Sequence, residues 1–367
     1  MSRKGKNIYF RQDKRWEGRY HKGRKPNGRI KYGYVYGQTY EEVKEKLEPL
    51  RKSAEIMLRI YGKSMMEFHE WSGHLLEEWK DTLKPSTYSS YQHKMKRYLW
   101  EQLGELSLYQ LDELAIAKAV EAWKLQGLAL SSIKSIFRLL NQTLNHAVKQ
   151  RILEKNPCDQ VQLPKSLKTK VQALSRKQQK KLMQTAEKDN DYRGKAVILA
   201  MEAGMRIGEI AALKWEEVDF EASFIYVNNT YQRVSNDSGT ALLLGTVKTE
   251  ASQRIIPMSD RVRELLLQLR QGQKESEFVF TTKGKPCEPR VLTYHFHRIR
   301  KKAALSKVHF HQLRHTFATR CLEATADVLS VSRILGHSSI KMTLDTYAHS
   351  IQEQQVATVQ AMAQSVA

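Results

Sequence analysis

Apolar residues recur at helical spacing through one long segment of the chain, from Ser64 to about Lys155, and this pattern limits the segment to α-helices. Four helices are expected, each with one apolar stripe. The stripes consist of Phe68, Trp71, Leu75 and Trp79 on the first helix, Tyr88, Tyr91, Met95 and Tyr98 on a second that Pro85 opens and Gly104 closes, and Ile133, Ile136, Phe137, Leu140, Leu144 and Val148 on the fourth, with the third helix near residues 111–126. Helices of roughly 15 residues with one apolar face each pack into a four-helix bundle.

The bundle leaves a long stretch of chain on either side. At about 150 residues per domain, 367 residues predict two to three domains. Asn156-Pro157 ends the last helix, and the polar, basic and aperiodic residues 163–170 are typical of a linker. We therefore expect an N-terminal module at residues 1–62, the helical domain at residues 63–163, a linker at residues 164–170 and a third domain at residues 171–367.

The third domain mixes two patterns. A helix is expected after Ser175, and the chain is again mostly helical after Pro257. Between them, short β-branched and aromatic runs predict strands at Phe224–Val227, Tyr231–Val234, Ala241–Leu244 and Arg254–Ile256. This domain is thus expected to be mixed α+β, and the whole chain multidomain and mainly α with small β-sheets.

The charge of the chain is large and uneven. Lys and Arg number 61 against 39 Asp and Glu, and the net charge of +22 favours a polyanionic partner. Residues 1–31 hold 12 of the basic residues and only two acidic ones, Asp13 and Glu17. The candidate DNA-binding residues are Arg11, Lys14, Arg15, Arg19, Lys22 and Arg24, together with Lys94, Lys96 and Arg97 in the bundle. For the bundle cations, a solvated helix face is an equally good interpretation.

Aromatic residues accompany the N-terminal charges at the spacing of β-strands: Tyr9, Trp16, Tyr20, Tyr32, Tyr34 and Tyr36. Between them stand glycines that resemble turn positions, namely Gly18, Gly23, Gly28, Gly33 and Gly37. We predict a small β-sheet with the aromatic residues as its thin core, followed by a helix at about residues 40–61. A disordered basic tail is the alternative. A lipid surface is a poorer partner than nucleic acid, because no basic amphipathic helix carries the charge.

Several protein classes are disfavoured by composition. The longest plain apolar run, Val197–Met201, is too short to span a membrane, and no apolar stretch follows the basic N-terminus as in a secretory signal. Cys158, Cys287 and Cys321 are scattered, which argues against a disulfide framework or a zinc ribbon. We expect a cytoplasmic protein.

Two histidine pairs are weak candidates for a metal site. His69 and His74 are one residue too far apart for the zinc-protease spacing, and on a helix they point about 140° apart. His311 and His315 are four residues apart, but no third ligand stands at motif spacing. No metal and no cofactor are therefore predicted.

The strong functional signal is a dispersed set in the last half of the chain. Its five segments are Gly204–Glu209, Val247–Thr249 with Ser252–Pro257, His311–His315, Leu335–His337 and Thr346–His349. Attack on a DNA phosphodiester needs an in-line nucleophile, cations at the non-bridging oxygens and a proton for the leaving oxygen. Arg206 and Arg314 suit the cationic role as guanidinium forks. Lys248 suits the general acid, and Tyr347 the nucleophile.

In the order and spacing of these segments, the whole chain resembles the tyrosine recombinases, the integrase family of phages and integrative elements. The resemblance implies an arm-site-binding module made of a three-stranded sheet and a helix, then a core-DNA-binding domain, then a catalytic domain. It places the catalytic set on Arg206, Lys248, His311, Arg314, His337 and Tyr347, with Glu209 and His315 in supporting positions. The arginines would hold the scissile phosphate, and Lys248 would protonate the leaving 5′ oxygen. His311 would accept or share the tyrosine proton, and His337 would hydrogen-bond a non-bridging oxygen.

The resemblance also implies a reaction and an assembly. Tyr347 would form a covalent 3′-phosphotyrosine without metal or ATP, and four protomers on two double-stranded DNA sites would exchange strands through a Holliday junction. The sites would be attachment sites of core and arm type, and the outcome would be integration or excision of a phage or other mobile element in a bacterial host. An excision factor and a host DNA-bending protein are further candidate partners. The apolar tail residues Ile351, Val356, Val359 and Met362 would dock on a neighbouring protomer, or else cap their own chain.

Three alternatives stay open at this point. A type IB topoisomerase-like enzyme would share the chemistry, but relaxation of one duplex needs no second DNA-binding module. A non-catalytic DNA-binding regulator would have no need of Lys248 and Tyr347. A metal-dependent transposase would need a carboxylate cluster and would leave the Arg, His and Tyr set without a role.

Overall fold

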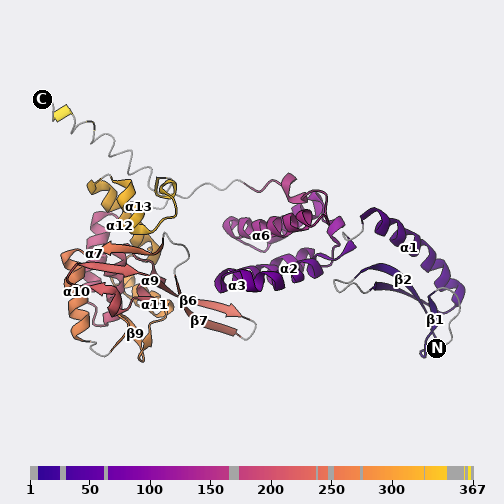
Figure 1. The fold of residues 1–367 in the computed structure, drawn as a ribbon, viewed down its shortest axis with the longest axis horizontal. Coiled ribbons are helices and arrows are strands. Elements are labelled where there is room, and N and C mark those ends of the chain that lie inside the picture. The colour runs from indigo at the N-terminus through magenta and orange to yellow at the C-terminus, as the bar shows by residue number, and fades with distance from the viewer. Residues whose placement is uncertain are drawn as a thin grey trace. The chain divides into compact units, whose positions relative to one another are not determined.

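The structure is a computed structural model, and it describes residues 7–24, 30–61, 65–164, 173–236, 239–246, 252–272, 276–325, 327–344, 359 and 363–364. The chain forms two compact units, Met1–Leu167 and Lys168–Ala367 (Figure 1). Within these described residues, no helix is both long enough and apolar enough to cross a membrane.

The first unit begins with a three-stranded antiparallel sheet. Strands β1 (Ile8–Phe10), β2 (Trp16–Arg24) and β3 (Ile30–Gly37) pair in this order, and helix α1 (Tyr40–Tyr61) follows them. The helix packs across one face of the sheet (Figure 1). The small sheet and the helix that the sequence predicts are therefore confirmed.

The core of this module matches the predicted aromatic core only in part, because Trp16 and Tyr20 pack against its buried residues. The buried apolar residues are Ile8, Val43 and Leu47, whereas the exposed ones include Tyr32, Tyr34 and Tyr36. Side chains alternate along a strand, so the three tyrosines share the face of β3 opposite Val35, which packs against α1. Gly18 is not a turn residue but lies inside β2, where a Cβ would come within 2.7 Å of Val43 on α1. Glycine thus allows the close approach of helix and sheet.

Helices make up the remainder of the first unit. They are α2 (Phe68–Thr82), α3 (Pro85–Lys94), α4 (Trp100–Leu103), α5 (Glu113–Leu125) and α6 (Leu130–Lys149). Their apolar stripes meet in one core, whose largest fully buried side chains include Phe68, Leu75, Met95, Trp123 and Ile133. The helical bundle predicted from apolar spacing is confirmed.

The second predicted helix of the bundle is not α-helical throughout. α3 continues directly into a π-helical turn, Met95–Leu99, which leads into α4, and Gly104 caps the end. A π turn accommodates an extra residue, and such turns are frequent at functional sites. This one buries Met95 and Leu99 while Lys96 and Arg97 lie on its outer side, exposed. Apolar spacing alone does not reveal the change of helix type.

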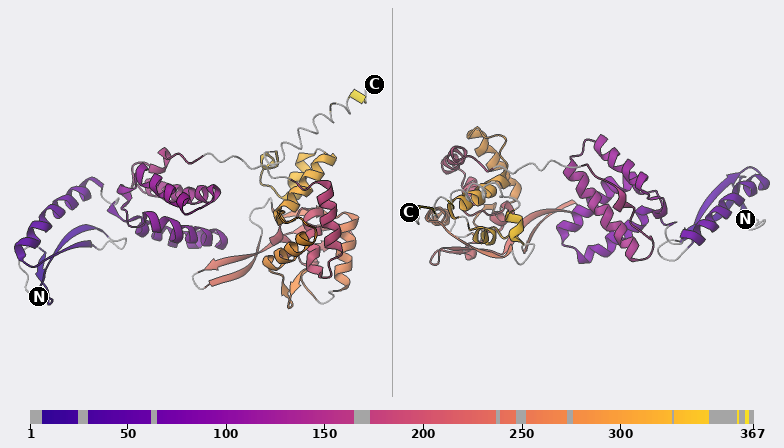
Figure 2. Two further views of the ribbon diagram at one scale, coloured as in Figure 1. Left: turned by 180° about the vertical axis from the view of Figure 1, so that it is seen from behind. Right: turned by 90° about the horizontal axis from the view of Figure 1, so that it is seen from above.

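The second unit is mixed α+β, as predicted. Its helices are α7 (Arg176–Glu187), α8 (Ala196–Glu202), α9 (Ile207–Ala212), α10 (Asp260–Gln271), α11 (Pro289–Lys302), α12 (Phe310–Thr325) and α13 (Val328–Leu335). Strands β4 (Val218–Asp219), β5 (Phe224–Val227) and β8 (Arg254–Pro257) form an antiparallel sheet in that order. Two further sheets have two strands each. They are β6 (Asn229–Asn236) with β7 (Gly239–Thr246), and β9 (Thr281–Thr282) with β10 (Lys285–Pro286). The hairpin β6–β7 projects from the body of this unit (Figure 2).

Helix α8 lies at the centre of the second unit. All of its residues from Ala196 to Met201 are buried, and α7, α9, α10, α11 and α12 contact it. A helix that is apolar on every side is stable only inside a core, and here α8 is the element around which the others pack. Its C-terminal end leads directly to Gly204 and Arg206, the first of the predicted site residues.

Candidate active site

The backbone at Gly204 brings two predicted arginines together. Gly204 has a φ of +63°, and a Cβ there would come within 2.5 Å of the Phe317 ring on α12. Only glycine meets both conditions without strain. The turn that it makes places Arg206 at the N-cap of α9, and the Gly204 carbonyl accepts a hydrogen bond from Arg314 Nη1 at 2.7 Å.

Glu209 is the buried centre of the arginine cluster. Its Oε1 accepts from Arg206 Nη1 at 2.7 Å, and its Oε2 accepts from the Arg206 backbone N–H at 2.8 Å, in a capping box. On its other side Arg254 Nη1 and Nη2 lie 3.1 and 2.8 Å from the same two oxygens. Burial by itself would raise the pKa of Glu209, but the hydrogen bonds and charge of Arg254, followed by Arg206, lower it below the usual range. Glu209 is therefore ionised and holds both guanidinium groups.

Three arginines from three elements converge on the C-terminal end of α13. Arg254 Nε donates to the Ile334 carbonyl at 2.6 Å, Arg314 Nη2 to the Leu335 carbonyl, and Arg206 Nη2 to the Gly336 carbonyl at 3.4 Å. These successive carbonyls are among those that a helix leaves without intrahelical donors, and they carry its negative dipole end. The end of α13 is thus held by cations.

His337 follows this cationic anchor directly. Gly336 caps α13 in the left-handed conformation, with φ of 63°, and the next residue is His337, whose Nδ1 lies 2.8 Å from Oγ1 of the buried Thr343. A groove of about 660 Å³ between β8 and α13 reaches its side chain. Burial, and then the charges of Arg314 and Arg206, lower the pKa of His337 to about 4. The imidazole is therefore neutral at pH 7.

The two histidines of α12 lie beside the same cluster. The His311 and His315 rings meet edge to face with centroids 4.7 Å apart. Partial desolvation of the imidazole lowers the pKa of His311, and the charges of Arg314 and Arg206 lower it further. Burial, and then His311 and Arg314, lower the pKa of His315 to about 4. The structure therefore brings Arg206, Glu209, His311, Arg314, His315 and His337 together.

The neutral histidines predict how stability depends on pH. An unfolded histidine has a pKa near 6.5, whereas His315 and His337 titrate at about 4 in the folded chain, so the unfolded state binds more protons between these values. Their contribution to stability is complete above about pH 6.5 and is lost as the pH falls toward 4. We expect the thermal unfolding midpoint to fall across this window, and to fall less steeply in His337→Gln. The matched variant of the exposed His309, His309→Gln, should keep the wild-type slope; an unchanged slope in His337→Gln would contradict the assignment.

Two predicted catalytic residues, Lys248 and Tyr347, lie outside the described residues, as do the tail residues Ile351, Val356 and Met362. Val359 is described and exposed. Across the described ranges, no three His, Cys, Asp or Glu side chains are placed to share a metal ion. The residue that sequence reasoning missed is Arg254. Its segment stands among the five motifs, but nothing in its spacing indicates that the side chain turns inward to Glu209.

Three of the N-terminal candidates, Arg11, Arg15 and Arg19, lie on the sheet face that carries the exposed tyrosines. The guanidinium groups of Arg11, Arg15 and Arg19 sit over tyrosine rings at 4.8 to 5.8 Å from the ring centroids, in cation–π geometry. Glu17 is buried between them and accepts from Arg11 at 2.5 Å and Arg19 at 2.6 Å. Lys14 is exposed in the turn between β1 and β2, and the side chains of Lys22 and Arg24 lie outside the described residues.

The bundle candidates gather at the junction of α3 and its π turn. Lys94 Nζ donates to Ser90 Oγ at 2.9 Å, and partial burial, followed by the charge of Arg138, lowers the pKa of Lys94. Lys96 and Arg97 are exposed on the π turn. The three cations therefore share one stretch of helix, close to Arg138 on α6.

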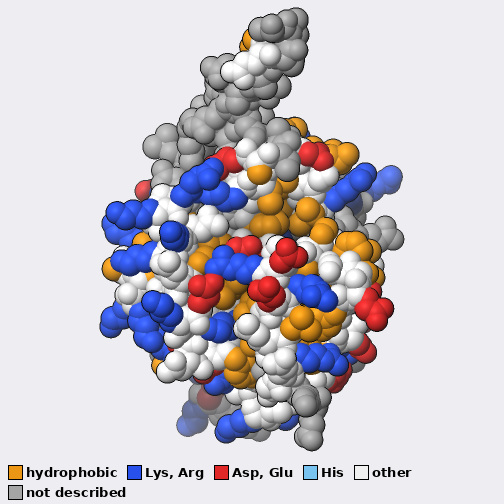
Figure 3. All heavy atoms as spheres, turned by 90° about the vertical axis from the view of Figure 1, so that its left-hand side faces the viewer, with side chains coloured by type: hydrophobic (Ala, Val, Ile, Leu, Met, Phe, Trp, Pro, Cys, Tyr) orange, Lys and Arg blue, Asp and Glu red, His pale blue; other side chains and the backbone are white. Residues whose placement is uncertain are grey.

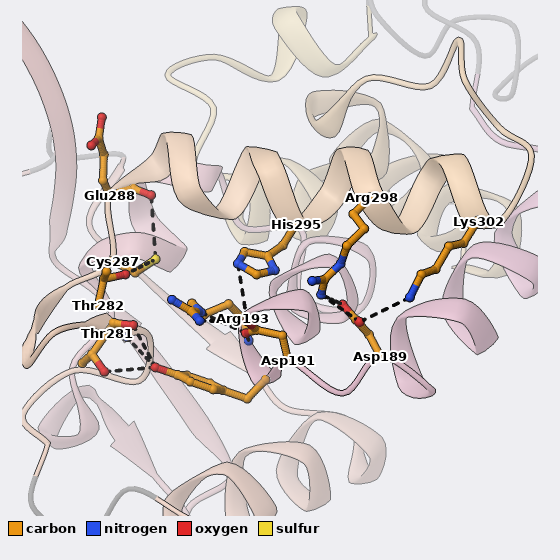
Figure 4. A network of polar contacts seen from close by, with 11 residues as sticks. Asp189, Asp191, Arg193, Thr281, Thr282, Cys287, Glu288, His295, Arg298 and Lys302 are labelled. Atoms are coloured by element: carbon orange, nitrogen blue, oxygen red, sulfur yellow. Dashed lines mark hydrogen bonds and ion pairs between the residues drawn. The ribbon is translucent and has the colours of Figure 1, made fainter.

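The second unit also holds a separate polar network, which contains none of the predicted catalytic residues. Figure 4 shows His295, Arg298 and Lys302 of α11 facing Asp189 and Asp191, which follow α7. Arg298 Nη2 lies 2.6 Å from Asp189 Oδ2, and His295 Nε2 lies 3.6 Å from Asp191 Oδ2. Burial, only partly offset by Asp191, lowers the pKa of His295. These contacts tie α11 to the end of α7 and have a structural role.

The side of the second unit that carries α7 and α10 shows cations and anions interspersed (Figure 3). Arg261 at the start of α10 bridges Glu187 and Glu202, and Arg320 lies 2.6 Å from Glu323. These ion pairs offset part of the positive charge on this side.

Comparison with known proteins identifies the family of both the helical and the mixed α+β domain. A model of the phage integrase family matches residues 172–354, and a model of the phage integrase SAM-like domain matches residues 67–163. A XerC-like tyrosine recombinase of Caldanaerobacter subterraneus is 26% identical over 371 residues, which cover 93% of each chain.

Two solved structures show that the fold is shared. The Tn1549 transposon integrase in complex with a circular intermediate DNA has a TM-score of 0.71 at 22% identity, covering 80% of this chain and 99% of that one. The lambda integrase tetramer bound to a Holliday junction has a TM-score of 0.59 at 20% identity, covering 91% and 96%. With family models matching both the helical and the mixed α+β domain, the chain belongs to the phage integrase family of tyrosine recombinases and is a site-specific recombinase that cleaves and rejoins DNA.

Proposed function

We propose that Tyr347 is the nucleophile of this recombinase and that the described cluster holds the scissile phosphate. The observation that supports this most is the convergence of Arg206, Arg314 and His337 at the end of α13. Arg206 is partly exposed, so its guanidinium contacts the phosphate from the solvent side. Arg314 is buried, so its guanidinium contacts the phosphate from the protein interior. Cations fixed before the substrate arrives stabilise the charge that develops on the phosphoryl oxygens.

The histidines take the roles that their neutral state permits. A neutral His337 acts as a hydrogen-bond donor to a non-bridging oxygen when its proton is on Nε2, and a Thr343 hydroxyl that donates to Nδ1 selects this tautomer. His311, which is exposed beside Arg314, accepts or shares the proton of Tyr347. Lys248 protonates the leaving 5′ oxygen. His315 supports His311 by ring packing, and Glu209 supports Arg206 by ion pairing.

The N-terminal half of the chain supplies DNA binding in this proposal. We assign residues 1–62 to arm-type sites through Arg11, Lys14, Arg15, Arg19, Lys22 and Arg24, and residues 63–163 to core sites through Lys94, Lys96 and Arg97. Residues 164–170 form the linker and 171–367 the catalytic domain. The starts of the two family matches, at residues 67 and 172, support this division.

The assembly follows the lambda integrase tetramer on its Holliday junction, with four protomers exchanging strands between two double-stranded attachment sites. In the proposed assembly of this chain, the tail beyond Tyr347 docks on a neighbouring protomer. The matches to an integrase of Bacillus subtilis and to the Tn916 transposase support a mobile element, phage or transposon, as the DNA that is integrated and excised in a bacterial cell. An excision factor and a host DNA-bending protein complete the proposed partners.

A nicked suicide substrate tests the proposed chemistry. A nick beside the scissile phosphate lets the short leaving strand diffuse away, so that the covalent intermediate accumulates. The full chain, incubated with a proven attachment site in EDTA, should form a protein–DNA adduct that withstands denaturation. No adduct on DNA that the protein demonstrably binds would overturn the proposal, and an adduct that requires added Mg²⁺ would point to the metal-dependent alternative.

The proposed role of Lys248 predicts a substrate-dependent defect. Lys248→Ala should slow cleavage of normal DNA by about 100-fold, because general acid catalysis is worth roughly 10²- to 10⁴-fold. DNA with sulfur at the 5′ bridging position should be cleaved by the variant nearly as fast as by the wild type, since a thiolate leaves without a proton. Single-turnover cleavage of both substrates measures the difference. Equal slowing on the two would remove Lys248 from the acid role.

A further inference from the structure

We infer that Arg254 is a positioning residue for DNA cleavage, acting through Glu209 and through the end of α13. It is buried, and its guanidinium makes two bonds to the Glu209 carboxylate and one to the Ile334 carbonyl. The inference rests on the proposed phosphate-binding role of Arg206. It gives Arg254 no direct contact with the DNA.

Arg254 restores the positive charge that Glu209 cancels. Glu209 orients Arg206, but a carboxylate 2.7 Å from a guanidinium also cancels its charge toward a phosphate. Arg254 binds the same carboxylate, so the three groups together keep one positive charge beside that of Arg314. Glu209 can therefore fix the geometry of Arg206 while the site keeps the net charge of two free arginines.

Arg254 also fixes the position of the end of α13. Arg254 Nε holds the Ile334 carbonyl at 2.6 Å, two residues before the Gly336 cap and three before His337. The other two arginines hold the following carbonyls, Leu335 and Gly336. Arg254 thus ties the strand β8 to the same helix end from which His337 projects, and it couples the position of His337 to that of Arg206 through Glu209.

The test separates charge from folding by changing the DNA. A methylphosphonate at the scissile position replaces one non-bridging oxygen by a methyl group and so removes one negative charge. Arg254→Met should slow single-turnover cleavage of ordinary DNA roughly 10- to 100-fold, the size of one charge interaction across roughly 6 to 12 Å at an effective dielectric of about 20. The loss on the methylphosphonate substrate, measured for both diastereomers, should be several-fold smaller. Equal losses on both substrates would overturn the inference in favour of a purely structural role.

A second variant covers the case in which the single substitution damages the fold. Glu209→Gln combined with Arg254→Met removes one negative and one positive charge together, and leaves no buried unpaired carboxylate. The double variant should cleave ordinary DNA at least fivefold faster than Arg254→Met alone. A double variant no faster than the single one would contradict the charge argument.

The matched control is Arg261→Met. Arg261 also bridges two glutamates, Glu187 and Glu202, but it is exposed and stands outside the cluster. Its cleavage rate should equal that of the wild type on both substrates. Wild-type protein that forms no adduct would count against the proposed phosphate site itself, whereas normal wild-type cleavage with equal losses in Arg254→Met counts against this inference alone.

Discussion

Tyr347→Phe should form no covalent adduct with a nicked attachment site while it binds the intact site as tightly as the wild type. Phenylalanine lacks the phenolic oxygen that attacks the phosphorus, so cleavage should fall by roughly 10⁴-fold or more, as when other nucleophiles are removed. The rest of the side chain is unchanged, and affinity for DNA rests mainly on phosphate contacts made by Lys and Arg. Denaturing gels measure the adduct, and a mobility shift measures binding.

Tyr294→Phe is the control for this prediction. Tyr294 lies on α11 with its side chain exposed, and it precedes Tyr347 as the nearest tyrosine in the sequence. It should form the adduct at the wild-type rate. An adduct that persists in Tyr347→Phe, or that disappears in Tyr294→Phe, would move the nucleophile to another residue.

Arg314→Gln should reduce cleavage by about 10²- to 10³-fold, the range found when one preorganised donor to a developing oxyanion is removed. Arg314 contributes charge beside the phosphate, and it also bridges the Gly204 and Leu335 carbonyls. The shorter glutamine cannot reach both, and each buried carbonyl left without a donor costs about 1–3 kcal/mol. We therefore expect a lower free energy of unfolding as well, measured by urea titration.

Arg320→Gln separates the two effects. Arg320 lies on the same helix, donates to the Leu174 carbonyl at 2.6 Å and pairs with Glu323, but stands outside the cluster. It should lose stability with little change in the single-turnover cleavage rate. If both variants cleaved equally well at a temperature where both are folded, Arg314 would have a structural role only.

Much of the fold follows from local patterns. The bundle helices and the strands β5 to β8 lie where apolar spacing and β-branched runs predict them, because these elements depend on which face of each element is buried. The π turn Met95–Leu99 was not predictable, since the extra residue leaves the apolar residues on the core side. The aromatic core of the N-terminal sheet was predicted correctly only in part. Trp16 and Tyr20 pack against the core, but Tyr32, Tyr34 and Tyr36 are exposed, because spacing shows that these three share a face but not which face α1 covers.

The amino-acid sequence by itself determined the family and the candidate set of catalytic side chains, because the order and spacing of Arg206, His311, Arg314 and His337 can be read directly from the sequence. Only the tertiary structure decided how these groups are held. Arg254 reaches Glu209 across 45 residues, Arg314 reaches Gly204 across 110, and Arg206 reaches Gly336 across 130. Such contacts depend on the packing of α8, α12 and α13 in three dimensions, and no local pattern encodes which carbonyl a buried guanidinium will find.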